Sequence, residues 1–148
     1  MGRMGRTRTA ALAATLAVAA ALAGCGGDAP EERVFLELGD AYAGLPEGAE
    51  LPRYEIGGPP LVGWIEEGER FALVTWGSSS CLSVMTRAEQ VAPDRIEIAY
   101  GPRGDGPCTA DLGPRTQEFA FPDDMNERPV TVRVTDVATN TTVDLALE

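Results

Sequence analysis

Apolar and polar residues alternate along much of the chain from residue 33 onward, and Gly or Pro interrupts the alternation at short intervals. Alternation with a period of two is typical of a β-strand with one buried face, whereas a helix repeats about every 3.6 residues. We therefore expect seven or eight strands, at residues 34–38, 61–65, 71–76, 82–85, 96–100, 116–121, 130–134 and 143–147.

Two pairs of these strands lie close enough in the chain to form hairpins. Residues 66–69 (Glu-Glu-Gly-Glu) separate the first pair, and Gly68 can adopt the positive φ of a tight turn. Residues 138–140 separate the last pair, and Asn140 tolerates the same conformation. We expect one helical turn at residues 86–91, and irregular chain over residues 39–60, which are rich in Gly and Pro.

Many short strands with Gly and Pro turns indicate an all-β protein. The architecture that we expect is a two-sheet β-sandwich, and the alternative is a small β-barrel. A chain of 148 residues permits one domain with one hydrophobic core. We assign that domain to residues 33–148.

The first 24 residues are typical of a targeting segment. Three arginines (Arg3, Arg6 and Arg8) precede an uncharged apolar run at residues 10–23, which is shorter than the ~20 residues of a spanning helix. The tetrapeptide Leu-Ala-Gly-Cys that ends at Cys25 resembles the bacterial lipobox. This resemblance implies a lipoprotein signal peptide at residues 1–24, cleavage between Gly24 and Cys25, and a diacylglycerol on the Cys25 thiol.

A lipidated Cys25 implies that the membrane is a partner of this protein. Two or three acyl chains give durable anchoring without a spanning helix, here at the outer face of the cytoplasmic membrane. Residues 26–32 contain Gly, Pro and acidic residues and are typical of a flexible tether. Because these residues extend over ~25 Å at most, we expect the domain to lie close to the lipid.

The charge of the chain argues against nucleic acid as a partner. Three of the 12 basic residues precede Cys25 and all 23 acidic residues follow it, so residues 25–148 carry a net charge of −14. Nucleic acids and anionic lipid surfaces both attract clustered Lys and Arg. We therefore expect the acyl chains, rather than surface charge, to hold the protein at the membrane.

The chain contains no Lys and no His, which excludes much of ordinary catalytic chemistry. A Ser–His–Asp, Cys–His or Ser–Lys arrangement cannot form, and neither can a His-based metal site. The acidic residues do not have the spacing of a dedicated calcium loop. We predict no catalytic residue, no metal site and no cofactor, although a carboxylate pair that is close in space cannot be recognised from spacing.

Cys81 and Cys108 are the cysteines that remain once Cys25 is lipidated. An exported compartment is oxidising, so we expect these two residues to form a disulfide. Their wide separation differs from the Cys-x-x-Cys spacing of redox-active pairs. The serines of residues 77–81 (Gly-Ser-Ser-Ser-Cys) have no base to activate them, so we interpret them as partners in local turn hydrogen bonds.

The large aromatic residues are candidates for a ligand platform. Trp64 and Trp76 lie on the first predicted hairpin, and Tyr42, Tyr54 and Tyr100 lie elsewhere. Each of them lies in or beside an apolar strand, which favours core packing over ligand binding.

Three segments together resemble a family of small, functionally uncharacterised exported lipoproteins of actinobacteria. They are residues 74–81 (Val-Thr-Trp-Gly-Ser-Ser-Ser-Cys), 108–112 (Cys-Thr-Ala-Asp-Leu) and 119–122 (Phe-Ala-Phe-Pro). In that family Pro commonly follows Trp-Gly-Ser-Ser-Ser-Cys, whereas this chain has Leu82. The similarity spans about residues 61–122 and supports the Cys81–Cys108 disulfide and a shared domain type, but implies no activity.

These features favour a non-enzymatic cell-envelope lipoprotein that binds an unknown protein or another envelope ligand. Such a binder should expose an apolar or aromatic patch outside its core. One alternative is an envelope hydrolase, which needs a cleft with a close Asp/Glu pair and a raised pKa. The other is a purely structural surface protein, which needs neither feature.

Overall fold

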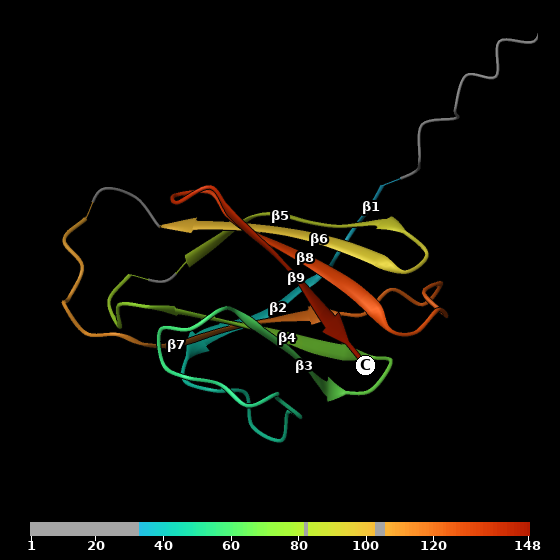
Figure 1. Ribbon diagram of the computed structural model, residues 1–148, viewed down its shortest axis with the longest axis horizontal. Helices are drawn as coiled ribbons and strands as arrows, with labels where there is room; N and C mark the ends of the chain where they lie inside the picture. Colours follow the sequence, from blue (N-terminus) through green and yellow to red (C-terminus); the bar gives the residue numbers. More distant parts are fainter. Residues whose placement is uncertain (1–32, 82, 103–105) are drawn as a thin grey trace, which may run out of the picture.

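The computed structural model describes residues 33–81, 83–102 and 106–148, and in these ranges the chain forms strands and no helix (Figure 1). The strands are β1 (Val34–Phe35), β2 (Leu38–Ala43), β3 (Leu61–Glu66), β4 (Arg70–Gly77), β5 (Ser83–Ala92), β6 (Arg95–Pro102), β7 (Gly113–Ala120), β8 (Val130–Asp136) and β9 (Thr141–Leu147). The predicted signal peptide, the Gly24–Cys25 cleavage site and the tether lie outside the described residues.

The strands form two sheets that pack face to face, which confirms the predicted all-β sandwich (Figure 1). One sheet has the order β1-β5-β6-β8-β9, and the other has the order β2-β7-β4-β3. Neighbouring strands are antiparallel except for β6 and β8, which are parallel. The two sheets stay separate rather than closing on each other, so the barrel alternative was wrong.

The core lies between the sheets and follows the alternation in the sequence. Ile96 and Ile98 of β6 are buried, and so are Val130, Val132 and Val134 of the neighbouring β8. The rings of Phe71 and Phe119 face each other across the pair β4 and β7, with 5.0 Å between their centroids. Burial of each such side chain stabilises the fold by about 1.5–3 kcal/mol, which is why this alternation specifies the inner faces.

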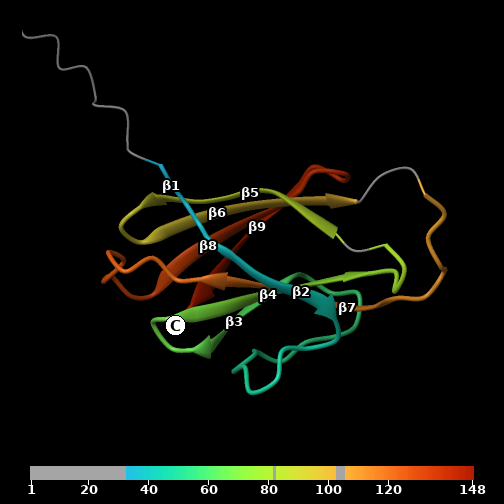
Figure 2. The same cartoon turned by 180° about the vertical axis from the view of Figure 1, so that it is seen from behind.

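The first predicted strand, at residues 34–38, is in fact two strands in different sheets. β1 pairs with β5 in one sheet, and β2 pairs with β7 in the other. Leu36 turns into the core between them, while its backbone N–H donates to the carbonyl of Ala88. The chain therefore crosses from one sheet to the other along one side of the sandwich (Figure 2).

The helical turn expected at residues 86–91 was also wrong, because these residues belong to β5. They pair with β6, but the register shifts between Met85 and Arg87 and again between Gln90 and Ala92. A bulge adds one residue and reverses the face on which later side chains lie. The period-two pattern is broken at these points, which is why the sequence did not indicate a strand here.

The predicted irregular segment was wrong at its beginning, because residues 39–43 belong to β2. This strand lies at the edge of its sheet and most of its side chains are exposed, so it has no alternation to recognise. Residues 44–60 contain no strand, as expected.

Both predicted hairpins are confirmed. β3 and β4 are joined by a turn in which Gly68 has a φ of 76°, and β8 and β9 by a turn in which Asn140 has a φ of 54°. In the part of the chain that the structure describes, no helix has the length and hydropathy that a membrane crossing requires.

Candidate functional site

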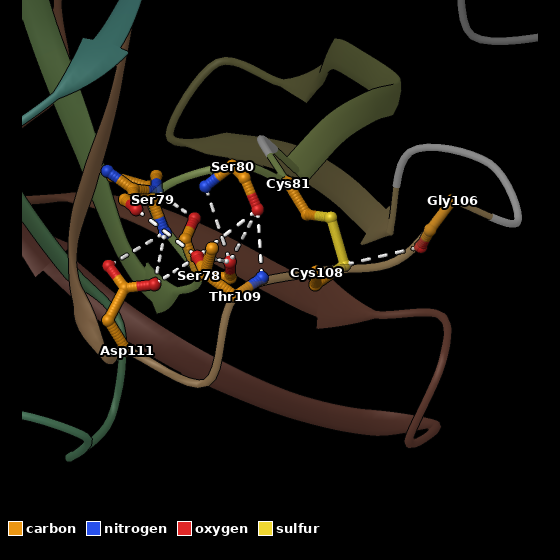
Figure 3. Close-up of a disulfide and its surroundings, with 9 residues drawn as sticks. Ser78, Ser79, Ser80, Cys81, Gly106, Cys108, Thr109 and Asp111 are labelled. Atoms are coloured by element: carbon orange, nitrogen blue, oxygen red, sulfur yellow. Dashed lines mark hydrogen bonds between the residues drawn. A yellow bond between two sulfur atoms is a disulfide. The ribbon is translucent and has the colours of Figure 1, made fainter.

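The Cys81–Cys108 disulfide is present as expected, with a distance of 5.5 Å between the two Cα atoms (Figure 3). Cys81 follows β4 and Cys108 precedes β7, and these two strands are neighbours in one sheet. The residues between the cysteines form β5 and β6 of the opposite sheet. The disulfide therefore joins the segment that leaves the four-stranded sheet to the segment that returns to it.

A group of polar side chains surrounds this disulfide, and we call it the hydroxyl cluster: Ser78, Ser79, Ser80, Thr109 and Asp111 (Figure 3). The Thr109 backbone N–H donates to Ser80 Oγ at 2.9 Å, and the Ser79 backbone N–H donates to Asp111 Oδ2 at 3.1 Å. The Thr109 hydroxyl donates to the Asp111 carboxylate. The serines thus make the local hydrogen bonds expected from the sequence.

These hydrogen bonds change the acidity of Asp111. The side chain of Thr109, followed by the side chain and backbone of Ser79, lowers the pKa of the Asp111 carboxyl to about 2. Donors to a carboxylate stabilise its charged form, so Asp111 is ionised at neutral pH. A carboxylate with so low a pKa is a poor general base, and the cluster supplies no other group that would activate a serine.

The opposite side of this loop is held by Arg115, whose side chain is buried. Its Nε–H donates to the carbonyl of Ser78 at 2.7 Å. Asp111 and Arg115 therefore hold the N–H and the carbonyl of the single peptide group that links Ser78 to Ser79, which accounts for these polar residues as parts of the fold.

The carboxylates give no support to the hydrolase alternative. Asp144 receives two hydrogen bonds from Arg133, at 2.8 and 2.9 Å, and these lower the pKa of its carboxyl. A general acid needs a raised pKa instead.

The phenol of Tyr42 also lies next to a carboxylate. Its pKa is raised, chiefly by burial and then by the hydrogen bond that it donates to Glu118. Over the described ranges, no three Cys, Asp or Glu side chains gather as metal ligands would.

A groove of about 1050 Å³ lies on the side of the sandwich where β3 and β9 are next to each other. We call it the β3–β9 groove. One wall is the loop of residues 50–60, and the other walls are residues 61–64 of β3 and residues 145–147 of β9, with Glu148 after them. The floor contains buried apolar side chains such as Leu61 and Leu147, while Glu50, Glu55 and Arg53 stand along the loop.

Gly63 positions the loop against β3. A Cβ atom at residue 63 would lie 2.2 Å from the Glu50 carbonyl oxygen and 2.9 Å from Leu51 Cδ2. The Glu50 backbone N–H also donates to the Trp64 carbonyl at 3.1 Å. The loop can therefore lie on the strand only because residue 63 has no side chain.

The candidate aromatic residues lie in the core, in this groove, or at half-buried positions outside both. Trp64 is buried as expected, with its ring 4.8 Å from that of Phe121. Tyr54 is 44% exposed and its ring lies 5.7 Å from that of Trp76, whose indole N–H donates to the Pro59 carbonyl at 3.1 Å.

The core assignment is confirmed for Trp64, and Tyr100 packs against the core. It was wrong for Tyr54, which lies on the surface, and for Tyr42 and Trp76, which are half-buried outside the core.

The groove could not be recognised from the sequence, since it is formed by residues 50–64 and residues 145–148, which are more than 80 residues apart in the chain. Neither a protein-family model, nor a curated protein, nor a solved structure matches this chain significantly. The geometry of the groove therefore carries the functional argument by itself.

Proposed function

We propose that this protein is a cell-envelope lipoprotein, held by acyl chains on Cys25, that binds a protein or another envelope component in the β3–β9 groove. The observation that carries the binding role is the groove itself. Ligand sites are typically concave and largely apolar, with a few polar groups at their edges. The groove combines a buried apolar floor with an exposed Tyr54 and charged residues on one rim.

The position of the protein outside the cytoplasm has independent support. The Cys81–Cys108 disulfide fits an oxidising compartment, in which disulfides persist. The basic, apolar and Leu-Ala-Gly-Cys segments of residues 1–25 stand in the order of a lipoprotein signal peptide. Anchoring at Cys25 would keep the domain within reach of envelope components.

Photocrosslinking from the groove tests the binding role. A photoreactive residue in place of Tyr54 should give a defined adduct in intact cells, because Tyr54 is exposed at the rim. The change Ala146→Trp should abolish that adduct, since Ala146 lines the groove and is exposed, so that a large side chain there narrows the site. Thr142→Trp is the matched control, because Thr142 is exposed on the same strand outside the groove.

An adduct that is equally abundant in both variants would contradict binding in the groove, and so would the absence of any adduct. Mass spectrometry of the adduct identifies the bound component. Thermal unfolding of both variants checks that the sandwich is intact.

The change Cys25→Ser tests the anchor. The wild-type protein should carry the mass of its acyl chains and sediment with membranes. The Cys25→Ser protein should lack this mass and bind membranes more weakly, because the acyl chains are the proposed anchor and a charge of −14 does not favour binding to an anionic lipid surface. A wild-type protein without acyl mass would overturn the proposed anchor.

A further inference from the structure

Apolar side chains are exposed where the chain crosses between the two sheets. Phe35 is 77% exposed, and Val34 and Leu38 are exposed beside it in the sequence. Phe35 and Leu38 also line a hollow of about 420 Å³ together with Met85 and Thr86 of β5. We call Phe35 and Leu38 the crossover patch, because both line this hollow, whereas Val34 precedes Phe35 in a strand, where successive side chains point to opposite faces.

A large aromatic side chain that is exposed to water is unfavourable, and a partner that covers it lowers the free energy. Transfer of a Phe side chain out of water is favourable. Phe35 belongs to a strand of two residues at the edge of its sheet, so the fold does not need an aromatic side chain there. Apart from Val34, the other exposed apolar residues lie elsewhere in the chain, for example Ile56, Leu112 and Val137.

The short stretch of chain between Cys25 and Phe35 indicates that the lipid surface covers the crossover patch. Phe35 follows Cys25 by ten residues, which span ~35 Å at most when fully extended. The patch is thus among the parts of the described domain that are nearest to the anchor along the chain. An aromatic ring accompanied by an aliphatic side chain is suited to the boundary between headgroups and acyl chains.

The charges next to the patch are compatible with lipid but do not drive its binding. Glu89 is buried, and its Oε1 lies 3.3 Å from an Arg33 guanidinium nitrogen and 3.5 Å from Arg87 Nε. Both arginine side chains remain half exposed, so their guanidinium groups can stay among the headgroups. Glu37 is exposed within the same segment, so the surface is not a basic patch.

We propose that Phe35 and Leu38 insert into the lipid interface beside the Cys25 anchor and set the orientation of the domain on the membrane. This inference rests on the proposed anchor. β1 and β2 form one side of the sandwich and β3 and β9 form the opposite side. Docking through β1 and the start of β2 therefore turns the β3–β9 groove away from the lipid, where envelope components can enter it.

Quenching by brominated lipid tests the orientation in the acylated protein. The change Phe35→Trp places a fluorophore in the patch, and the signal of the wild-type protein, which contains Trp64 and Trp76, is subtracted. In phosphatidylcholine vesicles the added emission should shift to shorter wavelength, and brominated acyl chains should remove most of it. Val137→Trp is the control, because Val137 is also apolar and 49% exposed but lies in the turn between β8 and β9, where its backbone N–H donates to the Tyr100 carbonyl, and not in β1 or β2.

Acyl mass is measured on the same samples, which separates failure of the anchor from failure of the docking. If the protein carries no acyl mass, the proposed anchor is wrong, and the docking proposal that rests on it is wrong as well. If the protein is acylated but bromination quenches Phe35→Trp no more than Val137→Trp, the docking is wrong and the anchor stands. A shift to shorter wavelength without quenching would place protein, such as a second copy of the chain, on the patch, and would equally overturn the proposal.

Discussion

Asp111 illustrates how one surface carboxylate organises a loop. It accepts hydrogen bonds from the Ser79 backbone and from the Thr109 hydroxyl, next to the disulfide. We expect Asp111→Asn to lower the melting temperature at pH 7, because an amide accepts these bonds less strongly than a carboxylate does. Asp124→Asn is the control, since Asp124 is exposed and accepts a hydrogen bond through its backbone carbonyl.

The pH dependence of this effect follows from the low pKa of Asp111. A carboxyl whose pKa is depressed on folding contributes stability above the pKa of the unfolded chain, ~3.9. That contribution disappears as the pH falls through about 2, the pKa of Asp111 in the folded protein. Melting curves of the wild type and Asp111→Asn should therefore converge between pH 4 and pH 2. A difference in melting temperature between the two proteins that stayed constant from pH 4 to pH 2 would contradict the low pKa of Asp111.

At the scale of the element, Asn140 specifies the turn between β8 and β9. Its φ of 54° lies in the left-handed region, where a residue with a Cβ atom loses roughly 1–2 kcal/mol and a branched side chain is especially unfavourable. We expect Asn140→Val to reduce the free energy of unfolding by about that amount, and Asn140→Gly to leave it nearly unchanged.

Urea denaturation measures both variants of Asn140. Ala138→Val is the control, because Ala138 is exposed in the same turn and has no positive φ. If Asn140→Val were as stable as Ala138→Val, the left-handed conformation would not be what the turn requires.

The same scale shows where sequence patterns predict strands and where they do not. β6, β8 and β9 have regular alternation and were predicted to within a few residues. β5 contains two register shifts and β2 is mostly exposed, so neither has a continuous period-two pattern. Whether a segment forms a bulge or an edge strand depends on its pairing with neighbouring strands. The local sequence contains no information on that pairing.

At the scale of the whole molecule, the disulfide crosslinks the two ends of the segment that forms β5 and β6 in the opposite sheet. Cys81 and Cys108 are 27 residues apart, and β5 and β6 lie between them. A crosslink over such a loop restricts the unfolded chain and stabilises the fold by about 3–4 kcal/mol. We expect the double variant Cys81→Ala/Cys108→Ala to lose this amount while it keeps the sandwich.

Chemical denaturation of the double variant and of the reduced wild-type protein checks this value. The two should unfold at the same denaturant concentration, because both lack the same crosslink. A loss below about 1 kcal/mol would mean that the unfolded chain is already restricted near β5 and β6, since the stabilisation acts mainly through the unfolded state.

The sequence by itself determined the all-β class, the two hairpin turns and the disulfide pair, because each depends on local alternation, on single residues or on the presence of two cysteines. The anchor at Cys25 remains a prediction of the same kind. The tertiary structure decided that the strand expected at residues 34–38 crosses between sheets, that Tyr54 lies on the surface, and that β3 and β9 form a groove with the loop of residues 50–60. Such features depend on contacts between residues far apart in the chain, and no local pattern specifies those contacts.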